Sequence, residues 1–327
     1  MMYDLKNWLR GFATRKQALI LTYHSIQKRS LPFTVWSHLS EERFELQIAY
    51  LAKHFRCVSL STLLNEMADG RIQPYTVAIT FDDGFLDNVT TAFPILQRYR
   101  IPATIFLTTN FVGNSQLLWP EQVSCALTIT KKPFLDFAGT RHTIETNDQK
   151  SKTYRQLAHV FKNMPPADIP QQLNEMLNQA EVTIEQINSS AWYGHLRAMD
   201  WNDAKMLRES GLVEFGAHTI THGCLSALTN ADAEHEIRES KHIIESHLGP
   251  IDYFAYPYGE GYYTDEHRSM CMRAGYKAVL TTLTQKSISP RTDCYALPRA
   301  GIGADTNMET FTYMLHGGVT RADTTAK

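Results

Sequence analysis

The sequence lacks the features that mark several common protein classes. Its 327 residues include only five cysteines, an odd number, and none of them forms a C-x-x-C pair. This excludes a regular disulfide framework and a paired zinc–thiolate site, and it predicts free thiols in a reducing compartment. The formal net charge is only −2. No overall electrostatic field therefore draws the chain to nucleic acid, and we expect no nucleic-acid partner.

Long hydrophobic runs are also missing. No stretch approaches the roughly 20 apolar residues that span a bilayer, and the first residues lack the apolar stretch and cleavage site of a signal peptide. Leu5, Trp8, Leu9 and Phe12 do fall at helical spacing with basic neighbours. They predict a short helix that either packs on its own domain or rests on a membrane surface. We expect a cytoplasmic location, with peripheral contact at the inner membrane face as the open alternative.

Short β-branched runs alternate with helical patterns, which is typical of parallel strands joined by crossover helices. This α/β pattern indicates either a barrel or an open doubly wound sheet. The predicted strands are Ala18–Tyr23, Thr76–Phe81, Ala103–Thr108, Leu212–Ala217, Tyr253–Tyr256 and Lys277–Thr282. The predicted helices are Glu41–His54, Asn88–Tyr99, Ala231–Leu248 and Asp265–Arg273.

One segment, from about residue 119 to residue 192, departs from this alternation. It has few β-branched runs and two long polar stretches that favour helix, Lys152–Lys162 and Pro170–Gln179. We interpret it as a mostly helical insertion within a single domain that covers residues 1–327. Such a segment either shapes access to a site as a lid or serves as a structural brace.

Two adjacent carboxylates follow a buried strand in Thr80-Phe81-Asp82-Asp83-Gly84. Buried carboxylates are costly unless a cation neutralises them, and the carboxyl ends of parallel strands are where active sites are built. An Asx-type turn chosen for its backbone is the alternative. The presence of two adjacent Asp residues, rather than one Asp before Gly84, favours a metal site over such a turn.

Two imidazoles follow another predicted strand in His218-Thr219-Ile220-Thr221-His222. At this spacing both side chains can converge on one metal ion, although a single such pair is often structural. One Asp and two His also leave a coordination position open for water, which is typical of catalytic metal sites.

Two weaker features lie at other strand ends. Tyr253–Gly259 ends in Pro-Tyr-Gly and places a backbone N–H and aromatic rings near the same rim. The rings of Tyr256, Tyr258, Tyr262 and Tyr263 either pack against sugar or anchor the loop. His24 ends the first predicted strand, where it is either a rim or core histidine or a functional group.

Together, T-F-D-D-G, H-T-x-x-H and a strand ending in P-Y-G resemble the NodB-homology polysaccharide deacetylases (carbohydrate esterase family four). The resemblance runs from about residue 18 to residue 303, apart from the insertion. It implies a distorted (β/α) barrel with fewer than eight complete strands, a divalent metal and hydrolysis of a sugar N-acetyl group. It also implies that Asp82 is the general base, that Asp83, His218 and His222 are metal ligands, and that the Tyr258 N–H completes an oxyanion hole.

The chain departs from the family pattern at two places. The family's Arg before the P-Y pair is replaced by Ala255, and the late L-x-H motif that supplies the general acid is missing. Leu21-Thr22-Tyr23-His24 instead resembles the circularly permuted poly-N-acetylglucosamine deacetylase branch. This implies that His24 is the general acid, with an imidazole that titrates near neutrality. In a barrel, the last matched segment lies beside the first strand, so we expect Arg299 to replace the missing Arg.

The expected substrate is an N-acetylhexosamine-containing glycan or glycan precursor. One Asp and two His suit zinc, while cobalt, nickel and iron stay open. Two other functions also stay open: a deformylase or amidase that acts on a lipid-linked amino sugar, and a non-catalytic carbohydrate-binding protein.

Overall fold

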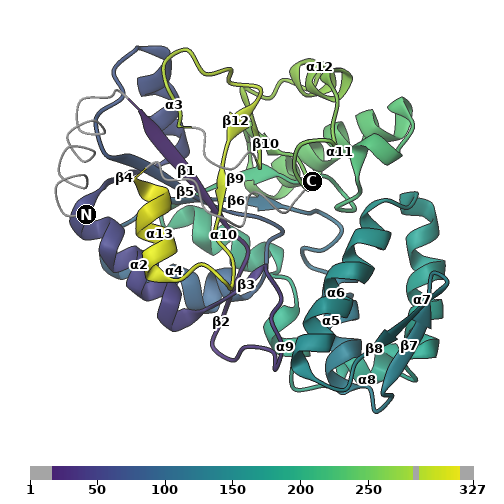
Figure 1. Cartoon of the computed structure of the whole chain (residues 1–327). Coiled ribbons are helices and arrows are strands. Elements are labelled where there is room, and N and C mark those ends of the chain that lie inside the picture. Colours follow the sequence, from purple (N-terminus) through teal and green to yellow (C-terminus); the bar gives the residue numbers. More distant parts are fainter. Residues whose placement is uncertain (1–16, 283–286, 317–327) are drawn as a thin grey trace.

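The computed structural model describes residues 17–282 and 287–316. Its centre is a strongly curved parallel sheet (Figure 1) in the order β12-β11-β10-β9-β6-β5-β1-β13, with β4 (Arg56–Val58) paired to the first half of β5. The strands are β1 (Ala18–Tyr23), β5 (Thr76–Phe81), β6 (Ala103–Leu107), β9 (Val213–Ala217), β10 (Tyr253–Ala255), β11 (Ala278–Thr281), β12 (Leu297–Pro298) and β13 (Ala300–Gly301).

A single short segment connects the two edges of this sheet. β12 pairs with β11 at one edge, whereas β13 pairs with β1 at the other, and only Arg299 separates β12 from β13. The sheet is therefore a nearly closed barrel in which the last two strands are two residues long. This confirms the predicted distorted (β/α) barrel with fewer than eight complete strands.

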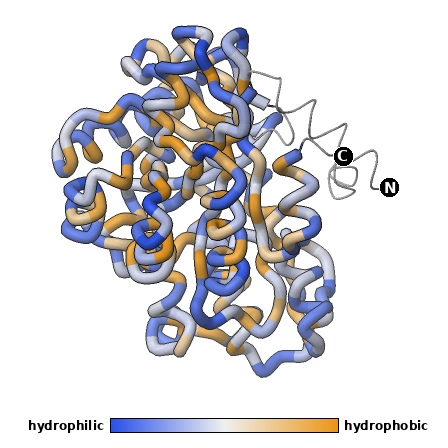
Figure 2. The backbone as a smooth tube through the Cα atoms, turned by 90° about the vertical axis from the view of Figure 1, so that its left-hand side faces the viewer, coloured by the Kyte–Doolittle hydropathy of each residue, from blue (hydrophilic) through white to orange (hydrophobic). Residues whose placement is uncertain are grey.

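The sequence patterns explain why these elements form. All side chains of β1 and β5 are buried, as expected for apolar strands covered on both faces. Ser40 caps α2 (Glu41–His54), and Thr229 caps α11 (Asn230–Leu248) by accepting a backbone hydrogen bond in the first turn. α11 ends before Gly249, whose φ of +80° favours glycine. Hydrophobic stretches run through the interior of the molecule, and hydrophilic stretches lie on the outer turns (Figure 2).

The remaining helices around the barrel are α3 (Leu60–Ala68), α4 (Phe93–Tyr99), α10 (Trp201–Glu209), α12 (Asp265–Arg273) and α13 (Met308–Leu315). Residues Asn88–Ala92 precede α4 as one turn of π-helix, within the range that the sequence predicts as a single α-helix. No helix among the described residues is both long and apolar enough to cross a membrane. The predicted N-terminal helix with Leu5, Trp8, Leu9 and Phe12 lies outside the described residues.

The predicted insertion is mostly helical and lies beside the barrel (Figure 1). Its helices are α5 (Trp119–Ile129), α6 (Asn147–Lys162), α7 (Ile169–Gln179), α8 (Ile184–Asn188) and α9 (Tyr193–Leu196). An antiparallel hairpin of β7 (Phe134–Phe137) and β8 (Thr140–Thr143), which the sequence analysis did not predict, connects α5 to α6. The insertion has its own hydrophobic cluster, in which Phe161 stacks on Trp119 and Phe137 with ring centroids 5.1 and 5.5 Å apart.

The insertion is held to the barrel by a loop that follows β1. Leu31, Phe33 and Val35 belong to the insertion's hydrophobic cluster, although they come early in the chain. This loop lies between β2 (Ser25–Gln27) and β3 (His38–Ser40), two short strands that pair with each other. The insertion thus packs against the rim at which β1 ends.

Candidate active site

The candidate site lies at the carboxyl ends of the barrel strands. Because every pairing in the barrel sheet is parallel, the residues that follow β1, β5 and β9 meet at one rim. His24 follows β1, Asp82 and Asp83 follow β5, and His218 follows β9. The structure brings together all four of these predicted site residues.

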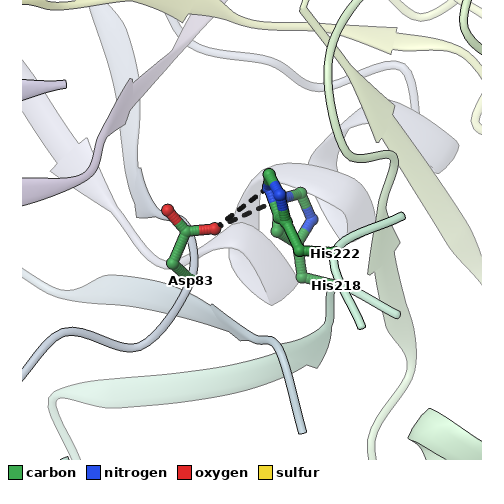
Figure 3. Close-up of side chains that lie close together, drawn as sticks. All are labelled: Asp83, His218 and His222. Carbon is green, nitrogen blue, oxygen red and sulfur yellow. Dashed lines mark ion pairs between the residues drawn. The ribbon is translucent and has the colours of Figure 1, made fainter. Parts of the chain in front are cut away.

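Asp83, His218 and His222 converge from two strand ends (Figure 3). Asp83 Oδ1 lies 3.2 Å from His222 Nε2 and 3.7 Å from His218 Nε2, and all three side chains are buried. One ligand atom from each side chain lies within 4.8 Å of the other two. Zinc–ligand bonds of about 2.0–2.2 Å at tetrahedral angles put ligand atoms roughly 3.3–3.5 Å apart, which these separations fit.

The electrostatics of the three side chains also suit a divalent cation. Asp83 Oδ1 is buried without a hydrogen-bond partner. Burial, and then the neighbouring Asp82, raises the pKa of Asp83, so its charge needs a cation. Burial lowers the pKa of His218 and of His222, which keeps both imidazoles neutral as ligands must be. His218 Nδ1 lies 2.7 Å from the Ala255 carbonyl, so Nδ1–H donates there and Nε2 faces Asp83.

The loop with the two histidines is fixed from behind by Glu236 on α11. Glu236 Oε2 accepts hydrogen bonds from the Ile220 and Thr221 N–H groups at 2.7 and 3.0 Å, and Oε1 accepts one from the Thr221 hydroxyl. His222 has a φ of +58°. Such a conformation is uncommon outside glycine, and this loop holds it by donating hydrogen bonds to a buried carboxylate. The sequence analysis missed Glu236 because it comes 14 residues after His222 on a separate helix.

Asp83, like His222, has a backbone with a positive φ. Its φ is +75°, and Gly84 after it has a φ of +94°. A Cβ on Gly84 would lie 2.9 Å from Leu107 Cδ2, so both the conformation and the space require glycine. The Asp-Gly turn that was the alternative interpretation is therefore present, and it orients Asp83 toward the histidines.

Asp82 is paired with Arg299, as the sequence analysis expected. Arg299 Nη1 and Nη2 donate hydrogen bonds to Asp82 Oδ1 and Oδ2 at 2.6 and 2.8 Å, and the guanidinium is fully buried. Nη1 also donates to the Thr22 and Thr80 hydroxyls. Burial alone would raise the pKa of Asp82, but Arg299, His218 and His24 outweigh burial and hold this pKa well below its usual range. Asp82 is therefore ionised and held in one orientation.

His24 lies on the other side of Asp82. Its Nε2 is 4.0 Å from Asp82 Oδ2, its Nδ1 has no hydrogen-bond partner, and its carbonyl accepts a hydrogen bond from Asn88 Nδ2 at 2.7 Å. Burial lowers the pKa of His24 to about 4, only partly offset by Asp82. This differs from the expected titration near neutrality, because the sequence does not show how deeply the first strand end is buried. His24 is thus neutral in the resting site.

Tyr258 lies next to the second histidine. Its ring centroid is 4.9 Å from that of His222, and its hydroxyl donates a 3.2 Å hydrogen bond to the His222 carbonyl. Its backbone has a φ of +63°. The Tyr258 N–H donates to no atom among the described residues and stays available to a substrate oxygen. Tyr256 and Tyr262 also line the site, whereas Tyr263 stacks on Tyr256 at 4.1 Å and anchors the loop.

These residues line a pocket of about 500 Å³, a size typical of small-molecule sites. Further lining residues come from the β2–β3 loop and from the insertion, the segment that the sequence predicts to be either a lid or a brace. Trp36 lies edge-on to His24 and packs against Gly303, and α5 and α6 of the insertion contribute Glu121 and Lys162. No motif marks these residues, and only the packing of the insertion on the rim brings them to the pocket.

The sequence profile of the polysaccharide deacetylase family matches residues 69–279, which is more than half of the chain. The chain belongs to the polysaccharide deacetylase family. The motifs that suggested this resemblance, T-F-D-D-G and H-T-x-x-H, both lie inside the matched range. The family prediction is confirmed.

Curated relatives match the deacetylase-like region in part. A poly-beta-1,6-N-acetyl-D-glucosamine N-deacetylase from Staphylococcus epidermidis is 31% identical over 113 residues, which cover 31% of this chain and 39% of the relative. The enzyme of the same name from Staphylococcus aureus is 33% identical over 108 residues, which cover 29% of this chain and 37% of the relative. The match thus spans about two fifths of the length of these relatives.

Solved structures share the fold over nearly the whole chain. The Streptococcus pyogenes deacetylase PplD has a TM-score of 0.58 at 18% identity, with 91% of this chain and 98% of that chain covered. IcaB from Ammonifex degensii has the same TM-score and identity, with 91% and 97% covered. At these identities, the likeness shows that the chain shares the fold of these proteins.

Proposed function

We propose that this protein is a metal-dependent hydrolase that removes the N-acetyl group from an N-acetylhexosamine in a glycan or glycan precursor. The observation that supports this most strongly is the pairing of two adjacent carboxylates in different roles. Asp82 is bound by Arg299, whereas Asp83 faces His218 and His222 with an unpartnered oxygen. A non-catalytic carbohydrate-binding protein has no need of an ionised, buried base beside a metal site.

A divalent metal held by Asp83, His218 and His222 would polarise the acetyl carbonyl and lower the pKa of a water. Side chains and one backbone N–H of the protein carry out the proton transfers and stabilise the developing negative charge. Asp82, kept ionised by Arg299, takes the proton of the attacking water. The Tyr258 N–H donates to the oxygen that becomes negative in the tetrahedral intermediate, an interaction typically worth about 3–4 kcal/mol. His24, whose Nε2 lies 4.0 Å from Asp82 Oδ2, receives from Asp82 the proton taken from the water and delivers it to the departing amine as the C–N bond breaks.

We infer that zinc is the native metal, because one carboxylate and two neutral imidazoles form a small tetrahedral set. Cobalt, nickel and iron are the alternatives for the same ligands.

The test is acetate release from polymeric, lipid-linked and nucleotide-linked N-acetylhexosamines, with chelator-treated protein reloaded with each metal in turn. Matched formylated substrates separate a deacetylase from a deformylase. Asp82→Asn is the control, because it should retain metal and lose turnover. Turnover that is unaffected both by chelation and by Asp82→Asn would refute the proposal.

We also propose that the protein acts in the cytoplasm, on a biosynthetic precursor. All five cysteines are free thiols, three of them buried, as suits a reducing compartment. A helix in the first residues would give peripheral contact with the inner membrane face. Cell fractionation tests both statements: protein found only in the periplasm or the medium would contradict them.

A further inference from the structure

One wall of the pocket carries positive charge that the proposed reaction does not use. Arg155, His159 and Lys162 line the pocket from α6, at positions i, i+4 and i+7 of the helix. This spacing places them on one face, along roughly 10 Å of helix axis. The opposite side of α6 contributes Leu157 and Phe161 to the core of the insertion, which fixes the direction of the charged face.

Lys162 is close to the candidate metal ligands. Its Nζ lies 5.0 Å from the centroid of the Tyr258 ring, and this ring is in edge contact with the His222 ring. Burial lowers the pKa of Lys162, which shows that the ammonium is partly withdrawn from water. One aromatic ring therefore separates this cation from the place where the acetyl group would be cleaved.

Neither Arg155 nor Lys162 forms an ion pair with any residue that the structure describes. Other arginines on the molecular surface do have ionic partners: Arg56 pairs with Glu66 on the barrel, and Arg141 pairs with Asp136 on the insertion. Lys162 is half-buried, whereas Arg155 and His159 are exposed. A half-buried cation without a partner, such as Lys162, is unfavourable unless a ligand supplies the opposite charge.

No carboxylate of the pocket forms an ion pair with Arg155 or Lys162 among the described residues. Asp82 binds Arg299 and Asp83 faces the histidines. Glu121, which is buried, lies with Oε1 3.6 Å from His38 Nε2. All three are buried, and the other residues that line the pocket include no carboxylate that could neutralise the α6 face.

We propose that this face, formed by Arg155, His159 and Lys162, binds an anionic group that the N-acetylhexosamine substrate carries beside its acetamido group. In a 2-acetamido sugar, the anomeric carbon is the direct neighbour of the carbon that bears the acetamido group. A phosphate on the anomeric oxygen would thus lie within one sugar ring of the scissile bond, where Lys162 is. A uronate in the next sugar is the other source of such a charge. This inference rests on the proposed function and names the class of its substrate.

Two matched pairs of probes distinguish the sources. The first pair is N-acetylglucosamine 1-phosphate and the neutral methyl glycoside of N-acetylglucosamine. The second is a tetrasaccharide that alternates glucuronate with N-acetylglucosamine and the neutral tetramer of N-acetylglucosamine. For the metal-loaded full chain, we expect kcat/KM to be about ten- to hundredfold higher for the anionic member of one pair, the range of a charge-assisted contact. The pair that shows the preference identifies the source.

Variants locate the preference on α6. Lys162→Gln should lower the anionic-to-neutral ratio of kcat/KM by about tenfold, Arg155→Gln by less, and Lys162→Arg should restore it. Lys152→Gln removes the same charge from an exposed position of α6 outside the pocket and should leave the ratio unchanged. Raising the salt concentration should reduce the preference in the unaltered chain and not in Lys162→Gln.

Equilibrium binding of the same probes separates this inference from the proposed function. If no probe releases acetate, the proposed function is wrong for these sugars. Tighter binding of an anionic probe by the unaltered chain than by Lys162→Gln would still support the anion site. Equal binding of charged and neutral probes, or a ratio that Lys162→Gln leaves unchanged, would overturn it.

Discussion

The barrel rim and the insertion wall face each other across one pocket, but they are built differently. On the rim, the polar side chains follow buried strands, and Asp82 has its ionic partner, Arg299, within the rim. On the insertion wall, the charged side chains come from one helix that packs on a separate hydrophobic cluster, and Lys162 has no ionic partner among the described residues. We propose that the rim carries out the bond cleavage, whereas the insertion wall selects the substrate. The two regions can therefore be altered separately.

The largest effect is expected at the metal ligands of the rim. Asp83→Ala, His218→Ala and His222→Ala should each lose metal and activity together, since three protein ligands are the usual set of an open catalytic site. Asp82→Asn should retain the metal and lose about 10²–10⁴-fold in turnover. Elemental analysis checks the metal content. Full occupancy in all three ligand variants would show that the metal is bound elsewhere.

His24→Ala should lower turnover by about 10²–10⁴-fold, the usual range for a general acid, without loss of metal. Steady-state kinetics measures the turnover, and elemental analysis of the same samples measures the metal content. His195→Ala, on α9 of the insertion and outside the pocket, is the matched control and should keep the turnover of the unaltered chain. Equal rates for both variants would assign proton delivery to another group.

Two arginine–carboxylate pairs test the difference between the rim and the insertion, because their geometry is alike and their burial differs. Arg299 and Asp82 are buried in the rim, whereas Arg141 binds Asp136 through two hydrogen bonds on the exposed hairpin of the insertion. Arg299→Ala should lower the free energy of unfolding by about 3–5 kcal/mol, because it leaves a buried charge unpaired.

The same variant should lower turnover by about 10²-fold through misplacement of Asp82. Arg141→Ala should leave both quantities nearly unchanged, because solvent screens an exposed pair. Chemical denaturation measures the difference. A similar loss of stability in both variants would contradict the argument from burial.

Phe161→Ala should have the smallest effect on the chemistry of the rim. It removes a ring that stacks on Trp119 and Phe137, so the insertion should lose about 3–5 kcal/mol of local stability. The metal content should stay unchanged, because no ligand comes from the insertion. Hydrogen exchange followed segment by segment checks both expectations. Protection lost equally in β5 and β9 would show that the insertion and the barrel unfold as one unit.

The sequence alone predicts six strands of the barrel and the polar residues that follow them, but not the short strands β2, β3, β4, β12 and β13. β1 and β5 have the predicted bounds, because strands buried on both faces read as continuous apolar runs. Asp82, Asp83, His218 and His222 could be found because each follows such a run within a few residues. The hairpin of β7 and β8 was missed, since each strand has only four residues and β8 (Thr140–Thr143) contains no apolar residue.

Contacts between distant segments set most of what lies beside these groups, although the chain order already predicted Arg299 near Asp82. Arg299 is 217 residues from Asp82, and its place depends on the short β12–β13 segment that connects the two edges of the barrel. The burial that lowers the pKa of His24 is likewise a property of the whole rim. The position of Lys162 against Tyr258 depends on how the insertion packs. Local patterns encode which residues end a strand, whereas contacts between distant segments are set by closure and packing, which no short motif records.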